Sequence, residues 1–309
     1  MKSVLCAYYG AKSQIVEKIL PHFPRGPETY VETCFGSGAL FFALPEGLYP
    51  NRVINDLNKG VVTFYKVLRE RPEDLLRVCE LTPFAFDEQR ACRDWTQDPE
   101  DELELARRVW VRQSQNFAGM QQTIEGFRRG TPKCSVARTA QNKLAQFHEY
   151  AKFFRGVEIN NTDAADLVRY YGKTGCFLYE DPPYHPSSRC AGHGYQHEME
   201  ASWHEKLLEA NLEASSKGAL IAISGYAGDF YDNAYKDWRR VEYTANAKSA
   251  NFLDAEDRQK TEVIWMNYQN QLKSAMASSQ NSQRPTSSNR YSRRRSSERG
   301  EHDETIPSE

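Results

Sequence analysis

Residues 176–184 read Cys-Phe-Leu-Tyr-Glu-Asp-Pro-Pro-Tyr, and this stretch decides the fold class of the 309-residue chain. Its first half is an apolar run of strand length. The two prolines end the strand, because each fixes φ and lacks an N–H donor. We expect the loop that follows to lie at the carboxyl end of a strand, which is the edge at which open α/β sheets bind their ligands.

The sequence on both sides of this stretch alternates between strand and helix patterns. Short apolar runs occupy residues 30–32, 52–54, 156–159, 219–223 and 261–268, and helical patterns begin near Ser13 and span residues 39–44 and 203–215. Helices placed between strands are what a largely parallel sheet requires. The predicted fold class is therefore α/β, with residues 1–60 and 155–269 forming the sheet domain.

Two segments differ from this sheet domain. Residues 61–154 are rich in long polar and aromatic side chains at helical spacing, which predicts a mainly helical insertion. Residues 270–309 include ten serines and few large apolar residues, which predicts a disordered tail. Within the insertion, residues 126–148 carry five basic side chains and no acidic one. Such a cluster without acidic residues raises the expectation of phosphate contact until it equals that of a solvated surface, and the two interpretations stay open.

Composition and charge exclude several classes of protein. With 40 Lys and Arg against 42 Asp and Glu, the net charge is -2, which argues against a uniformly basic nucleic-acid coat protein. No run approaches the roughly 20 apolar residues of a membrane helix. The first residues lack the pattern of a signal peptide, so we expect a cytoplasmic protein. The seven cysteines form no C-x-x-C pair, and Cys190, His193 and His197 have no obvious fourth ligand, so we expect no metal.

The loop after residue 180 offers hydrogen-bond acceptors and one aromatic ring. Such a loop suits a planar ligand that carries an amino group. The amine donates to Asp181 and to the Pro182 carbonyl, Pro183 keeps the turn rigid, and Tyr184 stacks on the face of the ligand. A strand-ending turn capped by the aspartate is the structural alternative. The aromatic residue and the strand context favour the binding site.

A glycine motif, Glu32-Thr33-Cys34-Phe35-Gly36-Ser37-Gly38, lies between a predicted strand and a predicted helix. Its two glycines allow a tight turn and a close approach of a ligand to the backbone. Phe41 takes the place of the third glycine of the dinucleotide fingerprint, which favours a nucleoside cofactor without pyrophosphate over a nicotinamide or a flavin. Asp56, at the end of the next predicted strand, is placed to accept hydrogen bonds from ribose hydroxyls.

Together these motifs resemble the Dam-type, D12 class DNA adenine-N6 methyltransferases over about residues 4–268. The resemblance implies a Rossmann-like methyltransferase sheet, S-adenosylmethionine as the cofactor and double-stranded DNA as the partner. Thr33 and Cys34 stand where the family has Pro and Phe. The implied catalytic residues are Asp181, Pro182, Pro183 and Tyr184. The implied cofactor-binding residues are Tyr8, Gly10, Lys12, Glu32, Phe35, Gly36, Ser37, Gly38, Asp56 and Asp163.

The resemblance further implies methyl transfer to the N6 amine of an adenine that has left the duplex stack. By residue type, base edges are assigned to Arg112, Gln113, Gln115 and Asn116, and phosphates to Arg128, Arg129 and Lys133. Residues 112–119 differ from the family pattern, so the recognised DNA sequence stays open.

Three other interpretations compete with this one. They are methylation of cytosine N4 or of RNA, a non-catalytic module that binds DNA or cofactor, and a nicotinamide-dependent oxidoreductase, the last disfavoured by Phe41. The sequence does not decide the oligomeric state. It also leaves open whether the setting is restriction–modification, a phage or host regulation.

Overall fold

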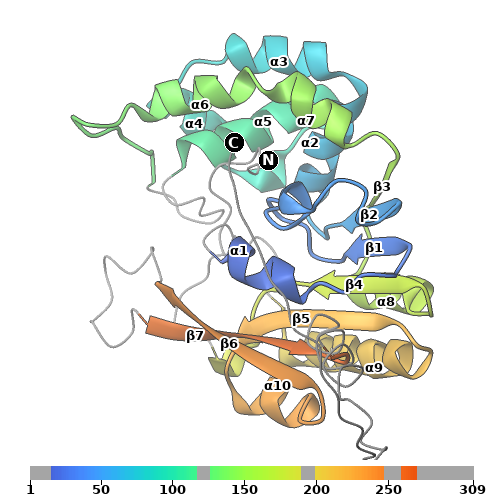
Figure 1. Ribbon diagram of the computed structural model, residues 1–309. Helices are drawn as coiled ribbons and strands as arrows, with labels where there is room; N and C mark the ends of the chain where they lie inside the picture. The colour runs from blue at the N-terminus through green and yellow to red at the C-terminus, as the bar shows by residue number, and fades with distance from the viewer. Residues whose placement is uncertain (1–14, 117–125, 189–198, 247–258, 270–309) are drawn as a thin grey trace, which may run out of the picture. The chain divides into compact units, whose positions relative to one another are not determined.

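A seven-stranded sheet forms the centre of the protein in the computed structural model, which describes residues 15–116, 126–188, 199–246 and 259–269 (Figure 1). The strand order is β3-β2-β1-β4-β5-β7-β6. The first five of these strands run parallel, and β7 pairs antiparallel with both β5 and β6. The strands are β1 (Thr29–Glu32), β2 (Asn51–Asn55), β3 (Val157–Asn160), β4 (Cys176–Glu180), β5 (Leu220–Tyr226), β6 (Arg239–Asn246) and β7 (Gln259–Met266). The predicted α/β class and its largely parallel, Rossmann-like sheet are confirmed.

Helices cover both faces of the sheet. One face carries α8 (Ala164–Tyr171), α9 (Ala201–Ser216) and α10 (Asp229–Ala234), and it is lined by residues such as Val31, Leu178 and Trp265. The other face carries α1 (Val16–Ile19) and the helices between β2 and β3. Because side chains alternate along a strand, neighbouring residues enter different cores. Tyr30 and Phe177 therefore lie in the aromatic core of the second face, next to strand residues that belong to the first.

Helices make up most of the described residues between β2 and β3. These are α2 (Lys59–Glu70), α3 (Pro72–Glu80), α4 (Phe86–Cys92), α5 (Glu102–Gln115), α6 (Val136–Leu144) and α7 (Phe147–Phe153), with a 3-10 turn at Trp95–Gln97. Their aromatic residues join the core of the sheet. Tyr65 of α2 meets Phe35 edge to face at 4.9 Å between ring centroids, and Phe154 stacks on Phe41 at 5.6 Å. The helices thus share a core with the sheet, and their separate role in target recognition stays a proposal.

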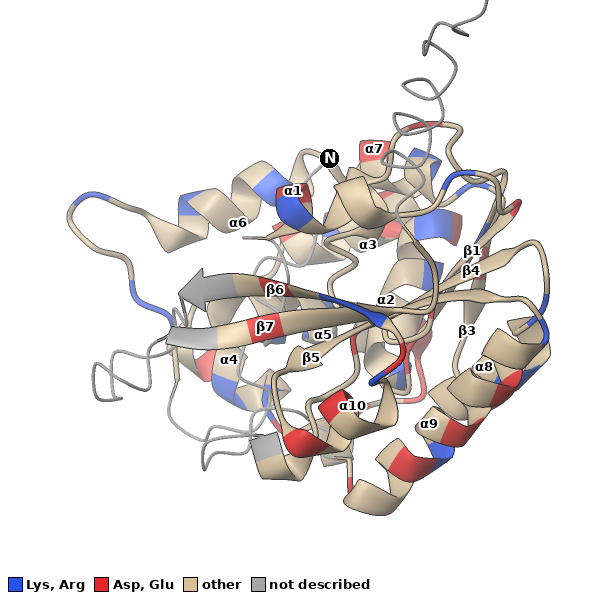
Figure 2. Cartoon of the chain, turned by 60° about the horizontal axis from the view of Figure 1, so that its bottom comes forward, with Lys and Arg blue, Asp and Glu red and all other residues tan. Residues whose placement is uncertain are grey.

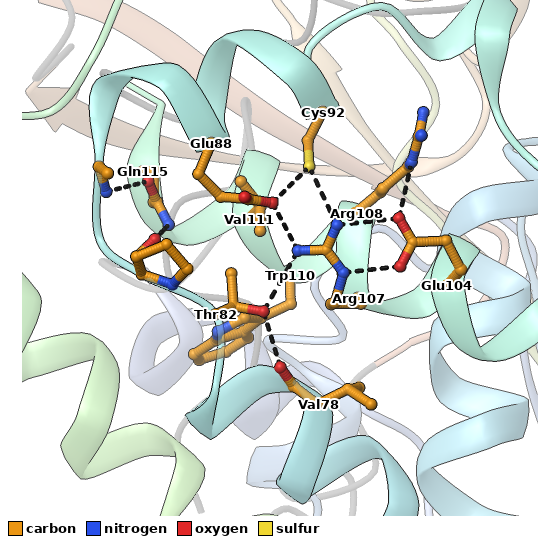
Figure 3. A network of polar contacts seen from close by, with 12 residues as sticks. Val78, Thr82, Glu88, Cys92, Glu104, Arg107, Arg108, Trp110, Val111 and Gln115 are labelled. Carbon is orange, nitrogen blue, oxygen red and sulfur yellow. Dashed lines mark hydrogen bonds and ion pairs between the residues drawn. The ribbon is translucent and has the colours of Figure 1, made fainter.

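A network of polar contacts joins three of these helices (Figure 3). Arg107 on α5 donates to Glu104 at 2.7 and 2.8 Å, to Glu88 on α4 at 2.5 Å, and to the Thr82 hydroxyl beyond α3 at 3.2 Å. Its side chain is 17% exposed. The hydrogen bond from Arg107 lowers the pKa of the Glu104 carboxyl. Because a charge withdrawn from water needs charged partners, this network fixes how α4 and α5 pack.

The local structure differs from the sequence prediction in three places. Residues 39–44 do not form an α-helix; they contain a short 3-10 turn at Phe41–Ala43, because Pro45 forces Leu44 into an extended conformation with ψ 135°. Of the helix expected from about Ser13, the described residues contain α1, and Pro21 lies in the 3-10 turn that follows it. Strand β6 was not predicted, since Arg239, Arg240 and Glu242 interrupt its apolar pattern.

Some expectations concern residues outside the described ranges. They are Tyr8, Gly10 and Lys12, the Cys190, His193 and His197 set, and the tail over 270–309. Among the described helices, none combines the length and the apolar character needed to span a bilayer. Within those same ranges, His, Cys, Asp and Glu side chains form no group of three that could hold a metal ion.

Candidate active site

The two motifs leave neighbouring strands at one edge of the sheet. Strands β1 and β4 pair in parallel with Glu32 opposite Tyr179, and the Thr33 N–H donates to the Tyr179 carbonyl at 3.2 Å. From β1 the chain proceeds outward to β2 and β3, and from β4 it proceeds in the other direction to β5. The boundary between β1 and β4 is therefore the topological switch point, where the carboxyl edge of an open sheet binds its ligand. The glycine loop and the Asp181 loop flank that point.

The glycine loop is a tight turn that needs both of its glycines. Gly36 and Gly38 have φ of 50° and 65°, and the Gly38 N–H donates to the Phe35 carbonyl at 2.7 Å. A Cβ on Gly38 would lie 2.3 Å from the Phe35 ring, which is itself 3% exposed. Phe35, expected at the cofactor, therefore supports the loop from inside the core. Ser37 is buried within the same turn.

Asp56 holds this loop in place. One carboxylate oxygen, Oδ2, accepts from the Gly36 N–H at 2.7 Å, and Oδ1 accepts from the Asn58 N–H at 2.8 Å. Asn58 in turn caps α2 by accepting from the Val61 N–H at 3.3 Å. Asp56, which is predicted to bind ribose hydroxyls, thus lies directly beside the glycine turn, at the carboxyl end of β2.

Asn55 joins the loops after β1 and β3, and sequence reasoning missed it. Its amide donates to the Thr33 carbonyl at 2.8 Å and to the Thr162 carbonyl at 3.1 Å, and its Oδ1 accepts from the Thr162 N–H at 2.9 Å. The side chain is 1% exposed. No motif in the sequence marks Asn55; a buried amide needs partners on both its atoms, and the fold alone brings the two loops to it.

Asp163 lies at the carboxyl end of β3 with both oxygens engaged. Oδ1 caps α8 by accepting from the Ala165 N–H at 2.8 Å, and Oδ2 accepts from the indole N–H of Trp203 on α9 at 2.7 Å. Nearby, the Asn161 amide donates to the carbonyl of Leu57, whose side chain is 39% exposed. A carboxylate that lies beside an indole at the carboxyl edge of the sheet is suited to a purine base.

Asp181 follows β4 and is held by β5. The Ser224 hydroxyl donates to Asp181 Oδ1 at 2.8 Å and approaches the Glu180 carbonyl at 3.1 Å. The Tyr179 hydroxyl lies 3.2 Å from the same Ser224 oxygen. Sequence reasoning found Asp181 and missed Ser224, because a lone serine inside an apolar strand has no motif around it.

Aromatic rings surround the end of the Asp181 loop. Tyr184 is 6% exposed and packs edge to face on Tyr226 of β5, with 4.2 Å between ring centroids. His185 stacks on Phe230 at 4.3 Å with an interplanar angle of 11°. Within the loop, Pro182 is buried and Pro183 is half-buried. The loop is therefore rigid on its protein side, as the two prolines predict.

Two buried carboxyl groups lie behind the two loops. Burial raises the pKa of Glu32 to about 8, the hydrogen bond from Tyr30 offsets part of the rise, and the carboxylates of Asp181 and Asp56 add to it. Burial also raises the pKa of Glu180 to about 8, against the hydrogen bond from an asparagine on α9. At neutral pH both groups are mostly protonated. A cation bound beside Glu32 would lower the pKa of this carboxyl and favour its ionised form.

The chain matches the family described as D12 class N6 adenine-specific DNA methyltransferase over residues 8–251. The protein belongs to this family. It is also similar to the Type II methyltransferase M1.LlaDCHI of Lactococcus lactis subsp. cremoris, with 25% identity over 273 residues that cover 84% of this chain and 94% of the relative. The family identifies the chain as an adenine-specific DNA methyltransferase, and members of such families use S-adenosylmethionine as a rule. The cytosine, oxidoreductase and non-catalytic interpretations do not agree with this membership.

The methyltransferase places its four predicted base-reading residues in the interior. Arg112 is 8% exposed and forms two hydrogen bonds with Asp98, at 2.8 and 2.9 Å. Gln115 accepts from the Ala85 N–H and donates to the Pro83 carbonyl (Figure 3). Asn116 accepts from the side-chain amide of Gln89. Gln113 is 3% exposed, and its Oε1 has no partner among the described residues. In this conformation these residues support the helices, and contact with base edges stays a prediction.

The three predicted phosphate-binding residues lie in the loop 126–135 before α6, which includes a tight turn and is called the hairpin here. The Thr131 N–H donates to the Cys134 carbonyl at 2.9 Å and the reverse bond is 3.0 Å, so residues 131–134 form a tight turn around Pro132. Arg129 and Lys133 are exposed and Arg128 is half-buried. Figure 2 shows basic residues along this loop. None of the ion pairs between described residues includes these three side chains.

Proposed function

We propose that the methyltransferase binds S-adenosylmethionine over the glycine loop, between Asp56 and Asp163, and methylates N6 of an adenine flipped into a pocket formed by Asp181, Pro182, Pro183 and Tyr184. The observation that carries this proposal is the placement of both loops at the switch point, on the adjacent parallel strands β1 and β4. A cofactor on one loop is then next to a base on the other.

The side chains at this edge fit the cofactor chemically. Asp56 and Asp163 are acceptors suited to ribose hydroxyls and to an adenine amine. Glu32 is a carboxyl group kept neutral by burial beside two carboxylates, which is an environment that favours a positively charged ligand. When bound, the cofactor supplies a methyl group attached to a positively charged sulfur.

The Asp181 loop then directs the nitrogen of the target base. The exocyclic amine of adenine is a poor nucleophile, because its lone pair is delocalised into the ring. Asp181 and the Pro182 carbonyl accept its two hydrogens and favour a tetrahedral nitrogen whose lone pair points toward the cofactor. In this scheme the N–CH3 bond would form as the S–CH3 bond breaks, S-adenosylhomocysteine would be the leaving group, and the proton lost by the nitrogen would pass to Asp181 and then to solvent. Tyr184 lies against the base and offsets part of the unstacking cost, which is on the order of a few kcal/mol.

The hairpin residues Arg128, Arg129 and Lys133 are proposed to contact DNA phosphates. The similarity to a Type II methyltransferase supports a restriction–modification setting. In that setting, DNA methylated by the protein resists a partner endonuclease that cuts unmethylated DNA.

Tritiated S-adenosylmethionine and double-stranded DNA, followed by nucleoside analysis, test the proposal. Asp181→Ala should lose at least about a hundredfold in methyl transfer and keep its affinity for the cofactor, since Asp181 acts on the base. The matched control is Asp166→Ala, which removes a carboxylate whose side chain is 72% exposed on α8. Near wild-type transfer by Asp181→Ala would overturn the assignment.

Base flipping has its own test. Once sequencing of modified DNA has identified the methylated site, 2-aminopurine replaces the target adenine. Its fluorescence should rise on binding of the protein, because flipping removes the stacking that quenches it. A signal that stays at the level of the free duplex would exclude flipping in the bound complex.

A further inference from the structure

Ser224 lies where β5 can act on the catalytic loop. Glu180 pairs with Ile223 across the β4–β5 ladder, so the next residues, Asp181 and Ser224, are neighbours at the carboxyl edge. The Ser224 side chain is 1% exposed, and its Oγ lies 2.8 Å from Asp181 Oδ1. The hydroxyl is thus a buried donor aimed at one oxygen of the carboxylate.

Tyr179 determines the direction of that donor. A serine hydroxyl has a single hydrogen. When Tyr179, which is 1% exposed, donates to Ser224 Oγ over 3.2 Å, the serine hydrogen is left to its two acceptors, Asp181 Oδ1 and the Glu180 carbonyl. The carboxylate is nearer and is charged, and charge-assisted hydrogen bonds are the stronger ones. The chain of hydroxyls therefore points from the core to Asp181.

An aspartate needs such a contact to present a defined oxygen. Rotation about the last bond of its side chain is broad, because it is an sp³–sp² torsion without sharp staggered minima. The preceding Glu180 and the following prolines fix the backbone of Asp181, whereas they do not fix this torsion. Since methyl transfer depends on a near-attack geometry, a carboxylate that rotates freely loses rate.

We propose that Ser224, oriented by Tyr179, is a positioning residue that fixes the rotation of the Asp181 carboxylate toward the target amine. The inference rests on the proposed function, in which Asp181 accepts a hydrogen from adenine N6. Ser224 itself touches neither the base nor the cofactor in this scheme. Its effect is therefore on kcat and not on the affinity for either ligand.

Substitution of the hydroxyl tests this role. Ser224→Ala should lower kcat by about ten- to a hundredfold, with Kd for S-adenosylmethionine and for DNA within about twofold of wild type. Ser224→Cys keeps the shape of the side chain but has a weaker donor. Its kcat should therefore lie between that of the wild type and that of Ser224→Ala. The control is Ser114→Ala: this serine is 2% exposed and donates to carbonyls of its own helix, so kcat should not change.

A double-mutant cycle separates positioning from packing. Tyr179→Phe should lower kcat less than Ser224→Ala does, and the double variant should be no slower than Ser224→Ala, because both substitutions break one chain. Additive losses would overturn the proposal. The matched control for the tyrosine is Tyr49→Phe, which removes a buried hydroxyl that donates to the Pro24 carbonyl at 2.7 Å.

Failure of this inference differs from failure of the proposed function. An inactive Asp181→Ala with a fully active Ser224→Ala would overturn the role of Ser224 and leave Asp181 in place. An active Asp181→Ala would overturn both. Should Ser224→Ala fail to fold, as judged by thermal unfolding, Ser224→Cys and Tyr179→Phe carry the test, and full kcat in both would overturn the proposal.

Discussion

Binding of the cofactor should release a proton from Glu32. The carboxyl is 3% exposed, burial raises its pKa to about 8 from an ordinary 4.5, and the Tyr30 hydroxyl donates to it at 2.7 Å. At pH 6.5 it is therefore almost fully protonated. S-adenosylmethionine carries a sulfonium and an ammonium, and either charge near Glu32 lowers its pKa again.

The size of the effect follows from this pKa. If only the ionised form binds well, the apparent Kd falls by about ninefold between pH 6 and pH 7. This range is preferred because the amino group of the cofactor titrates near pH 7.7–8.0, as α-amino groups do. At pH 6.5 about one proton should leave per cofactor bound. Titration calorimetry in buffers of different ionisation enthalpy measures that number directly.

Two variants make the measurement decisive. Glu32→Gln should abolish the proton release and flatten the pH dependence of Kd. Glu180→Gln is the matched control: Glu180 is fully buried, its pKa is also raised to about 8, and it faces Asn211 on α9. It should leave the proton release unchanged. A wild-type protein that releases no proton, or a Glu32→Gln variant that still releases one, would refute the assignment of Glu32 to the cofactor.

The same pKa has a consequence for stability without ligand. Because the folded-state pKa of Glu32 lies above its unfolded value, the stability associated with its neutral form is complete below pH 4.5 and is lost as the pH rises to about 8. The loss is at most about 4–5 kcal/mol. Glu32→Gln should therefore show a flatter decline of the unfolding free energy over this range in urea titrations.

Three further outcomes are expected. Trp203→Phe should raise Kd for S-adenosylmethionine several-fold in calorimetry and leave kcat at saturating cofactor unchanged, because Asp163 loses its indole donor; an unchanged Kd would contradict this role. Arg107→Ala should lower the free energy of unfolding by about 3 kcal/mol in urea denaturation, since it leaves Glu88 without its arginine and leaves Glu104 with Arg108 alone, and an unshifted midpoint would argue against the network. Replacing Arg129 and Lys133 by alanine should weaken DNA binding in fluorescence anisotropy and reduce the slope of log K against log salt by about 2; an equal slope would remove the hairpin from the interface.

The strands that carry the site could be predicted because each is a compact apolar run followed by a distinctive turn. Asp181 and Gly36 were found in this way, and both lie at the predicted edge. Strand β6 was missed because it is an edge strand with charged residues facing outward, which weakens the periodicity on which a prediction depends. The prediction of a helix at 39–44 was wrong. Phe41 and Phe42 are apolar because they pack in the core, and Pro45 ends the short 3-10 turn.

The residues that orient the site could not be identified from the sequence. Asn55 and Ser224 act across strands, over separations of 107 and 43 residues, and their importance follows only from the partner that the fold brings to them. The same applies to Arg112. Its side chain is of a type that often binds DNA, but in this fold it forms hydrogen bonds with Asp98. Residue type indicates what a side chain can do, while burial decides which partner it meets.

The aromatic packing of α2 and α7 has a consequence for engineering this enzyme. A chimaera that exchanges the segment between β2 and β3 would have to retain Tyr65, Tyr150 and Phe154, whose rings meet Phe35, Phe42 and Phe41 beneath the glycine loop. Grafts joined after α3 and before α7 keep those rings. Grafts joined directly at the ends of β2 and β3 would remove the aromatic side chains that pack beneath the glycine loop, so we expect them to weaken cofactor binding.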